Sequence, residues 1–163
     1  MQPSSLFLLS FLLVAPLHAH AVELVSLLPE TVGEMHLIQR VDGAEAQAEV
    51  DKLHGKPLPA KASVIGRYAR PSEVGQAHPA EVWISRVESE AEARRQTGLM
   101  VHKMFENPRS PFGHPTRLDR DGVPVYRFEG MGMAHLIWHK DDLVYWISVR
   151  PEGEEAMLAA FCR

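Results

Sequence analysis

Two segments, Met131–His139 and Leu143–Val149, alternate apolar and polar side chains and are joined by a turn at Asp141 and Asp142. A short acidic pair between two β-type segments is typical of a tight hairpin turn. Strands joined in this way are antiparallel neighbours, whereas parallel neighbours need a long crossover connection. The hairpin therefore favours an antiparallel sheet and argues against the doubly wound parallel sheets that bind nucleotides.

Alternation along the hairpin assigns its side chains to two faces. The turn would place Trp138 opposite Tyr145. The face expected to pack in the core carries Ala134, Leu136, Trp138, Tyr145, Ile147 and Val149. The opposite face carries Met133, His135, Ile137, His139, Val144 and Trp146. Because this second face mixes polar and apolar side chains, we expect its Trp146 to be partly exposed and available for a contact.

Three segments have the composition and the ends of helices. Residues 43–55 are rich in helix formers and finish on a glycine, which suits the left-handed residue after a helix. Ser89 is placed to cap a second helix, with Glu92 completing a capping box. A third helix is expected after Pro151. The expected apolar stripes are Ala46, Val50 and Leu53 on the first helix and Ala93, Thr97, Met100, Val101, Met104 and Phe105 on the second.

Further strands are expected at 36–41, 62–68, 81–87 and 123–128. Several of these strands follow one another directly instead of alternating with helices. This order predicts an α+β fold, with a largely antiparallel β-sheet and two or three helices packed on it, in a single domain. The connections at 71–79 and 107–115 are turn-rich loops that are too short to divide the chain.

The first twenty-one residues, Met1–Ala21, have the pattern of a secretory signal peptide. An apolar run from Leu6 to Leu17 precedes an Ala-His-Ala site, whose small first and third residues suit a signal peptidase. The run is too short to span a bilayer as a helix. We expect a bacterial protein that is periplasmic or secreted, with 22–163 as the exported domain and the leader either cleaved or retained as an anchor. After cleavage, no membrane span is expected.

Charge and cysteine content bear on two further classes of protein. The chain has 17 basic and 21 acidic side chains and a net charge of −4, so we expect no basic surface for nucleic acid. Its one cysteine, Cys162, cannot form a disulfide within the chain, and the fold must therefore rest on its core. Cys162 is either a small apolar residue of the last helix or a thiol that pairs with another chain.

The motifs of several common enzyme classes do not occur in the sequence. It contains no G-x-S-x-G, Walker-type glycine loop, G-x-G-x-x-G or H-E-x-x-H, and one cysteine cannot supply a paired-cysteine zinc site. The sequence therefore favours binding over catalysis. A hydrolase without a recognisable motif is the remaining enzymatic alternative.

A metal site is one candidate function of the hairpin. Alternation would place the thioethers of Met131 and Met133 and the imidazole of His135 on one strand face, near Trp146. Soft thioether and imidazole ligands suit Cu(I). In these ligand types alone, the segment resembles the small periplasmic copper carriers, which implies copper as a cofactor. In the alternative, both methionines fill an apolar layer beneath a helix and no cofactor binds.

Partner binding, at three separate places in the sequence, is the other candidate function. Its residues lie where the first helix ends in a loop, in the proline-rich loop, and on the mixed face of the hairpin. They are His54, Lys56, Arg109, Phe112 and Trp146. Such loops often carry binding residues, although cations near a helix C-terminus also interact with its free carbonyl groups. We therefore expect an accessory domain of the bacterial envelope that binds an envelope protein or a small ligand.

Overall fold

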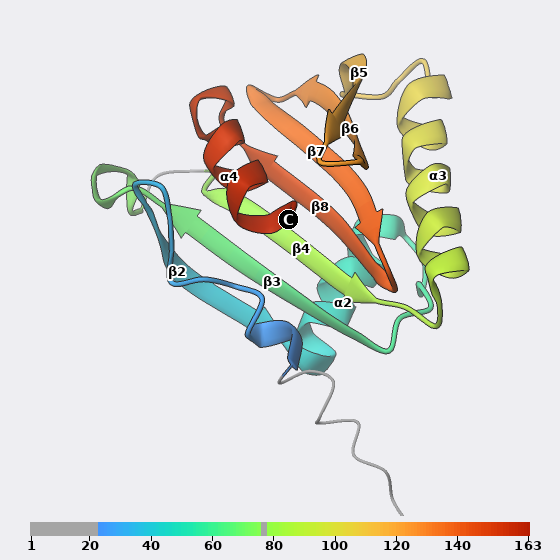
Figure 1. Cartoon of the computed structure of the whole chain (residues 1–163), viewed down its shortest axis with the longest axis horizontal. Coiled ribbons are helices and arrows are strands. Elements are labelled where there is room, and N and C mark those ends of the chain that lie inside the picture. Colours follow the sequence, from blue (N-terminus) through green and yellow to red (C-terminus); the bar gives the residue numbers. More distant parts are fainter. Residues whose placement is uncertain (1–22, 76–77) are drawn as a thin grey trace, which may run out of the picture.

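The computed structural model describes residues 23–75 and 78–163, so the proposed signal peptide Met1–Ala21 lies outside the described residues. The described strands form one antiparallel sheet in the order β1-β2-β3-β4-β8-β7-β6-β5. Helices α2, α3 and α4 pack on this sheet (Figure 1). The arrangement confirms the predicted α+β fold with a largely antiparallel sheet.

Where the sequence predicted both ends of an element, the observed bounds agree to within two residues, and two strands were not predicted. The strands are β1 (Thr31–Val32), β2 (Met35–Asp42), β3 (Ala62–Ala69), β4 (Ala80–Arg86), β5 (Gly113–Arg120), β6 (Val123–Gly130), β7 (Met133–Lys140) and β8 (Leu143–Val149). The helices are α2 (Gly43–His54), α3 (Glu90–Glu106) and α4 (Glu154–Phe161), with 3-10 turns at Pro71–Glu73 and Pro151–Gly153. Within the described residues, no helix is long and apolar enough to cross a membrane.

The predicted hairpin is formed by β7 and β8. Trp138 lies opposite Tyr145, and Leu136 lies opposite Ile147, as the short turn predicted. The Trp138 and Tyr145 rings stack with their centroids 4.7 Å apart and their planes 3° from parallel. Because both rings are buried, this cross-strand pair contributes directly to the core.

The start of β7 differs from the prediction, because Met131 is a turn residue and not a strand residue. Met131 and Gly132 form the turn between β6 and β7, with φ values of 55° and 75°. Two successive residues with positive φ are what a type I′ hairpin turn requires. The turn takes Met131 out of the strand pleat. Its side chain is 68% exposed, whereas Met133 is buried.

One face of the sheet is closed by α4 and by the N-terminal segment 24–28. Figure 1 shows α4 lying in front of the sheet. The core on this face includes Leu24, Leu28, Val64, Tyr68, Val82, Ile84, Leu136, Trp138, Ile147, Met157 and Cys162. The Tyr68 hydroxyl donates a 2.9 Å hydrogen bond to the Pro29 carbonyl oxygen, so this buried polar group is satisfied.

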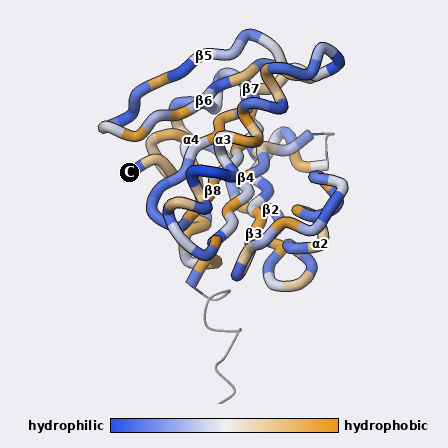
Figure 2. Tube along the Cα trace, turned by 90° about the vertical axis from the view of Figure 1, so that its right-hand side faces the viewer, coloured by the Kyte–Doolittle hydropathy of each residue, from blue (hydrophilic) through white to orange (hydrophobic). Residues whose placement is uncertain are grey.

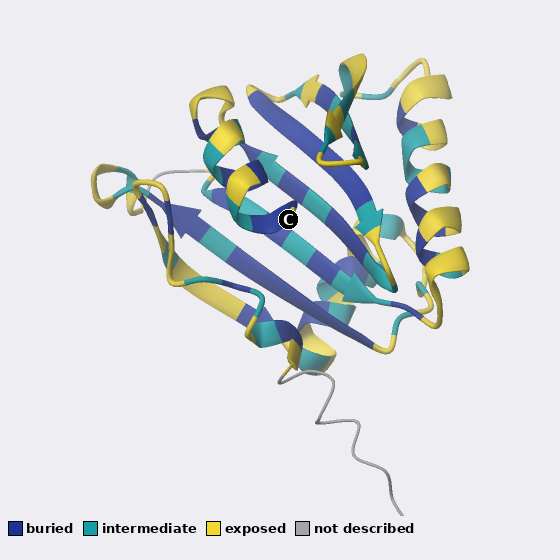
Figure 3. Cartoon of the chain, in the orientation of Figure 1, coloured by how far each residue is buried: buried dark blue, intermediate teal, exposed yellow. Residues whose placement is uncertain are grey.

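The other face is covered by α2 and α3, so the central strands of the sheet are buried on both sides. Ala46 of α2 packs on Ile65, and Met104 of α3 packs on Ile137. Figure 3 shows β7 buried along most of its length, while the outer side of α3 is exposed. Strand β7 therefore lies between two apolar layers, and much of the mixed face of the hairpin belongs to a second core.

Strand β5 was not predicted, and part of it falls in the segment expected to be the proline-rich loop. It is the edge strand beside β6 and contains Pro115, which an edge position tolerates. Most of its residues are exposed, and Figure 2 shows its trace largely in the hydrophilic colour. Without a buried face, the sequence of β5 has no apolar alternation to reveal it.

The helix ends are mostly as predicted, and the apolar stripes are as predicted except at Leu53 and Phe105. Gly55 ends α2 in the left-handed region at φ 65°, and Ser89 Oγ accepts the backbone N–H of Glu92 at 3.3 Å. The capping box is wrong, because the Glu92 carboxylate accepts bonds from Arg95 and Gln96 instead. Leu53 is 50% exposed and Phe105 is 67% exposed, so neither belongs to a buried stripe.

Two glycines provide a matched pair of alanine substitutions. A Cβ on Gly130 would lie 2.5 Å from the Pro111 carbonyl oxygen, whereas a Cβ on Gly98 in α3 would meet nothing within 4 Å. We expect Gly130→Ala to lower the free energy of unfolding by about 1–3 kcal/mol, because backbone must move. Gly98→Ala should raise it by about 0.5–1 kcal/mol through helix propensity.

Urea unfolding followed by circular dichroism measures both changes. If Gly130→Ala had the same free energy of unfolding as wild type, this would contradict the close packing of the loop before β5 against β6.

Candidate functional site

A groove lined mainly by apolar side chains crosses the sheet between α2 and α3. It consists of two adjoining hollows. The loop-side hollow, of about 300 Å³, lies beside the segment 56–59, and the turn-side hollow, of about 330 Å³, reaches Phe112 and the β6–β7 turn at Met131. The residues that line both hollows are Leu53, His54, Trp83, Met100, Lys103 and Trp146. Each hollow has the volume of a small-molecule site.

Two indole rings form the floor of the groove. Trp83 on β4 and Trp146 on β8 are directly paired across neighbouring strands. The indole N–H of Trp83 donates to Glu81 at 3.2 Å, and that of Trp146 donates to Ser148 Oγ at 3.2 Å. Both indoles are only partly buried. Because their N–H groups are already bonded, the groove presents the apolar ring surfaces to a ligand.

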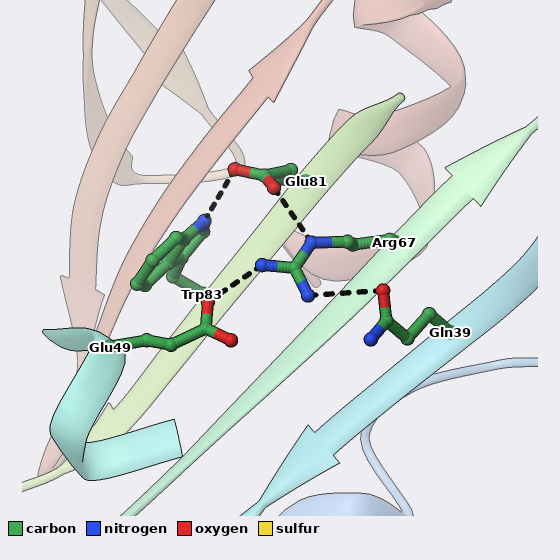
Figure 4. A network of polar contacts seen from close by, with 5 residues as sticks. All are labelled: Gln39, Glu49, Arg67, Glu81 and Trp83. Atoms are coloured by element: carbon green, nitrogen blue, oxygen red, sulfur yellow. Dashed lines mark hydrogen bonds and ion pairs between the residues drawn. The ribbon is translucent and has the colours of Figure 1, made fainter. Parts of the chain in front are cut away.

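A polar network holds the Glu81 carboxylate beside the groove (Figure 4). The Arg67 guanidinium donates to Glu81 at 2.9 Å, to Glu49 at 2.6 Å and to Gln39 at 3.2 Å. Partial burial lowers the pKa of Arg67, but its bonds to Glu81 and Glu49 outweigh this effect and leave the pKa above its usual value. The Glu81 carboxylate accepts hydrogen bonds from Arg67 and from Trp83. It therefore adds no unpaired negative charge to the groove.

A second polar chain lies beneath the turn-side hollow. His135 Nε2 lies 3.1 Å from the Gly130 carbonyl oxygen, and Nδ1 lies 2.9 Å from Ser148 Oγ. A carbonyl oxygen only accepts, so Nε2 carries the proton and Nδ1 of the neutral ring accepts from the Ser148 hydroxyl. The Phe112 ring meets the imidazole edge-on with a centroid distance of 4.7 Å. Both nitrogens of this buried histidine are thus satisfied.

The electrostatics of His135 agree with this hydrogen-bond pattern. Burial lowers the pKa of the imidazole, and the bond to the Gly130 carbonyl offsets this only in part. The neutral ring and Ser148 together link Trp146 to the backbone at Gly130 and hold the indole in place. A hydroxyl bonded to an imidazole is also the pair that a serine hydrolase uses, so this contact fits the hydrolase alternative.

The wall of the loop-side hollow is held by side chains from both helices. Asp51 of α2 accepts the backbone N–H of Leu58 at 2.9 Å. From the other side, the Gln96 side chain of α3 donates to the Pro59 carbonyl oxygen at 2.9 Å. The segment 56–59 therefore bridges the two helices and closes this end of the groove.

Positively charged groups lie on the groove walls. Lys56 and Lys103 are exposed and form no ion pair with any residue of 23–75 or 78–163. His54 Nδ1 donates to a carbonyl oxygen of its own helix at 2.8 Å, while its Nε2 is buried without a hydrogen-bond partner among the described residues. Arg95, by contrast, is bonded twice to Glu92, at 2.7 Å each.

The groove brings together most of the site residues proposed from the sequence. Those that line it are His54, Lys56, Phe112, Met131, His135 and Trp146. The other two line neither hollow: Arg109 is exposed in the loop after α3, and Met133 is buried in β7. The partner-binding and copper candidates therefore share one surface.

The sequence did not indicate three residues at the centre of the groove. Leu53 and Met100 were expected in apolar stripes facing the core, and Lys103 carried no signal at all. An apolar stripe shows which side of a helix faces the sheet, but not how far the next helix stands from it. The exposed fraction of Leu53 depends on that spacing.

Comparison with known proteins assigns no function. No family model matches the chain, and the comparisons with curated proteins and with solved structures found no match. Within the described part of the chain, no three histidine, cysteine, aspartate or glutamate side chains are grouped to hold a metal ion. Methionine is not among these four residue types, and several methionines line the groove.

The buried neutral imidazole predicts a pH dependence of stability. The folded-state pKa of His135 lies below the unfolded value of about 6.5, so the unfolded state binds more protons below that pH and stability falls. His135→Gln removes this dependence of stability on protonation, because glutamine does not titrate. We expect the variant to be less stable than wild type by about 1–3 kcal/mol at pH 7.5, because two buried bonds are lost. The difference should shrink at pH 5.5.

Urea unfolding at the two pH values measures this difference. Burial also lowers the pKa of His139, but His139 is present in both proteins and its effect cancels. A difference in stability that is the same at both pH values would contradict the neutral, bonded His135.

Proposed function

We propose that this chain acts by binding, and that its ligand is a small molecule with a large apolar part, held in the groove between α2 and α3. One observation carries the proposal: the paired indoles of Trp83 and Trp146 stay partly open, although the central strands of the sheet are otherwise largely buried. Concave apolar sites with a few fixed polar groups are typical of ligand pockets.

The dimensions of the groove favour a small ligand over a folded partner. Its two hollows are concave and measure about 300 and 330 Å³. A stable interface between folded proteins instead uses about 800 Å² of surface on each partner. Leu53 of α2 and Met131 of the β6–β7 turn are exposed at the edges of the groove, where they would cover a ligand from either side.

The polar groups around the groove support binding more than catalysis. Glu81 is matched by Arg67, and His135 has both nitrogens bonded, so these groups serve to fix the walls. A reaction at Ser148 would have to compete with the hydrogen bonds that hold Trp146. For these reasons we place hydrolysis behind binding.

A neutral hydrophobic dye tests the proposal. N-phenyl-1-naphthylamine should bind the full chain saturably, with a rise in its fluorescence. Leu53→Asp places a charge in both hollows without removing a buried side chain, so we expect dye affinity to fall by about tenfold or more.

Phe105→Asp is the matched control, because Phe105 is an exposed apolar residue of α3 that lines neither hollow. It should bind the dye as wild type does. Absence of saturable binding by wild type, or equal loss in both variants, would contradict the proposal.

Copper binding is the second candidate, and one observation favours it. The turn-side hollow brings the thioethers of Met100, Met104 and Met131 to the same cavity as the His135 imidazole. These are ligands of the type that Cu(I) prefers. For His135 Nδ1 to bind the ion, the Ser148 hydroxyl would have to turn its proton away.

Competition with a chromogenic Cu(I) chelator separates this candidate from the first. Met131→Leu removes the exposed thioether and keeps an apolar side chain, so copper binding here predicts about a tenfold loss of Cu(I) affinity or more. Met157→Leu, in the core on the opposite face, is the control. Identical Cu(I) affinities of wild type and Met131→Leu would exclude a copper site in this hollow.

A further inference from the structure

We propose that the ligand is a free carboxylic acid with an alkyl chain. Its carboxylate would lie in the loop-side hollow near Lys56 and Lys103, and its alkyl chain would run along the indole floor into the turn-side hollow. This inference rests on the proposed function, since it names the class of ligand for the same groove.

Charge complementarity selects an anion. The carboxylates beside the groove are already matched, because Glu81 is bound by an arginine of β3 and Glu92 by an arginine of its own helix. Lys56 and Lys103, in contrast, have no ion pair within the described residues. The groove therefore has an excess of positive charge that an acidic ligand would neutralise.

The two unpaired cations lie toward one end of a groove that is lined by apolar side chains along its length. Lys56 lines only the loop-side hollow, and Lys103 stands where the two hollows meet. The turn-side hollow shares Lys103 with the loop-side hollow and extends to Met104, Phe112 and Met131. A molecule with one acidic end and one long apolar end would match this order. A compact ion would contact only the lysines, and a uniformly apolar molecule would leave the lysines without a partner.

The donors present suit a carboxylate better than a phosphate. A guanidinium binds phosphate through a planar fork of two hydrogen bonds, but the fork of Arg95 is committed to Glu92 at 2.7 Å on each side. The bonds from Arg95 and Gln96 hold the pKa of Glu92 at about 2, so this carboxylate stays charged and keeps its partner. Lysine ammonium groups act as point charges, which is sufficient for a singly charged head group.

Calorimetric titration of the full chain with decanoate and with 1-decanol tests the inference at pH 7.5. The two probes share an alkyl chain and differ in charge. We expect wild type to bind decanoate roughly tenfold more tightly than 1-decanol. The double variant Lys56→Gln, Lys103→Gln should lose that preference, with 1-decanol affinity unchanged.

Lys52→Gln is the matched control, because Lys52 is an exposed lysine of α2 that lines neither hollow. It should retain the preference for decanoate. Equal affinities of wild type for the two probes, or an unchanged preference in the double variant, would overturn the carboxylate assignment and leave the groove as an apolar site.

Two other outcomes overturn it differently. If wild type binds neither probe and does not bind the neutral dye, the proposed function fails together with this inference. If wild type binds no decanoate but sediments with phosphatidylglycerol vesicles, and the double variant does not, the lysines belong to a membrane-facing surface and the free acid is excluded.

Discussion

Burial of both faces of a single antiparallel sheet is the constraint on which the rest of this structure depends. On one face, α4 and the N-terminal segment close over Tyr68 and Trp138 and complete a continuous core. On the other face, α2 packs on β2 and β3, whereas α3 packs on β7 and β8. Strand β4 lies between these two contacts, and its Trp83 is paired with Trp146 in the strip that neither helix covers fully. The groove is thus a consequence of where two helices of this length can rest on the sheet.

Hydrogen bonds satisfy most of the polar atoms beside this open strip. A buried polar atom without a partner costs free energy, and an unmatched buried charge costs several kcal/mol. Arg67 and Glu81 are hydrogen-bonded to each other on one side of the groove, and His135 and Ser148 are hydrogen-bonded to each other on the other side. Each of these networks also bonds the N–H of one floor indole. The same hydrogen bonds that pair these polar groups therefore hold the two indole rings in place. Lys56 and Lys103, in contrast, have no ion pair within the described residues.

The β7–β8 hairpin could be predicted from the sequence because its register depends on a short turn and on alternation, which are both local. The groove could not be predicted in this way, since His54, Lys103, Phe112 and Trp146 come from four separate elements or loops. Their meeting depends on the angle and spacing of helices, to which an apolar stripe is insensitive. For the same reason, Leu53 was expected in the core and lies on the surface.

Histidine shows a second limit of sequence reasoning. His135 was a candidate ligand because of its residue type and its expected place on a strand, and it does lie on strand β7. Its two ring nitrogens are hydrogen-bonded to Gly130 and Ser148 and are therefore not free to bind a ligand without breaking these bonds. Ser148 belongs to the neighbouring strand. Such a partner is visible only once the strand register is known. Strand β5 escaped prediction for a different reason, because an exposed edge strand carries no apolar pattern.

The indole N–H resonances of the three tryptophans offer the most direct test of the groove as the binding site. Trp83 and Trp146 lie on its floor, and Trp138 is fully buried in the core on the opposite face. On titration of the 15N-labelled chain with decanoate, we expect the Trp83 and Trp146 signals to shift saturably while the Trp138 signal stays in place. Unchanged floor signals, or a shift of Trp138 alone, would contradict the account.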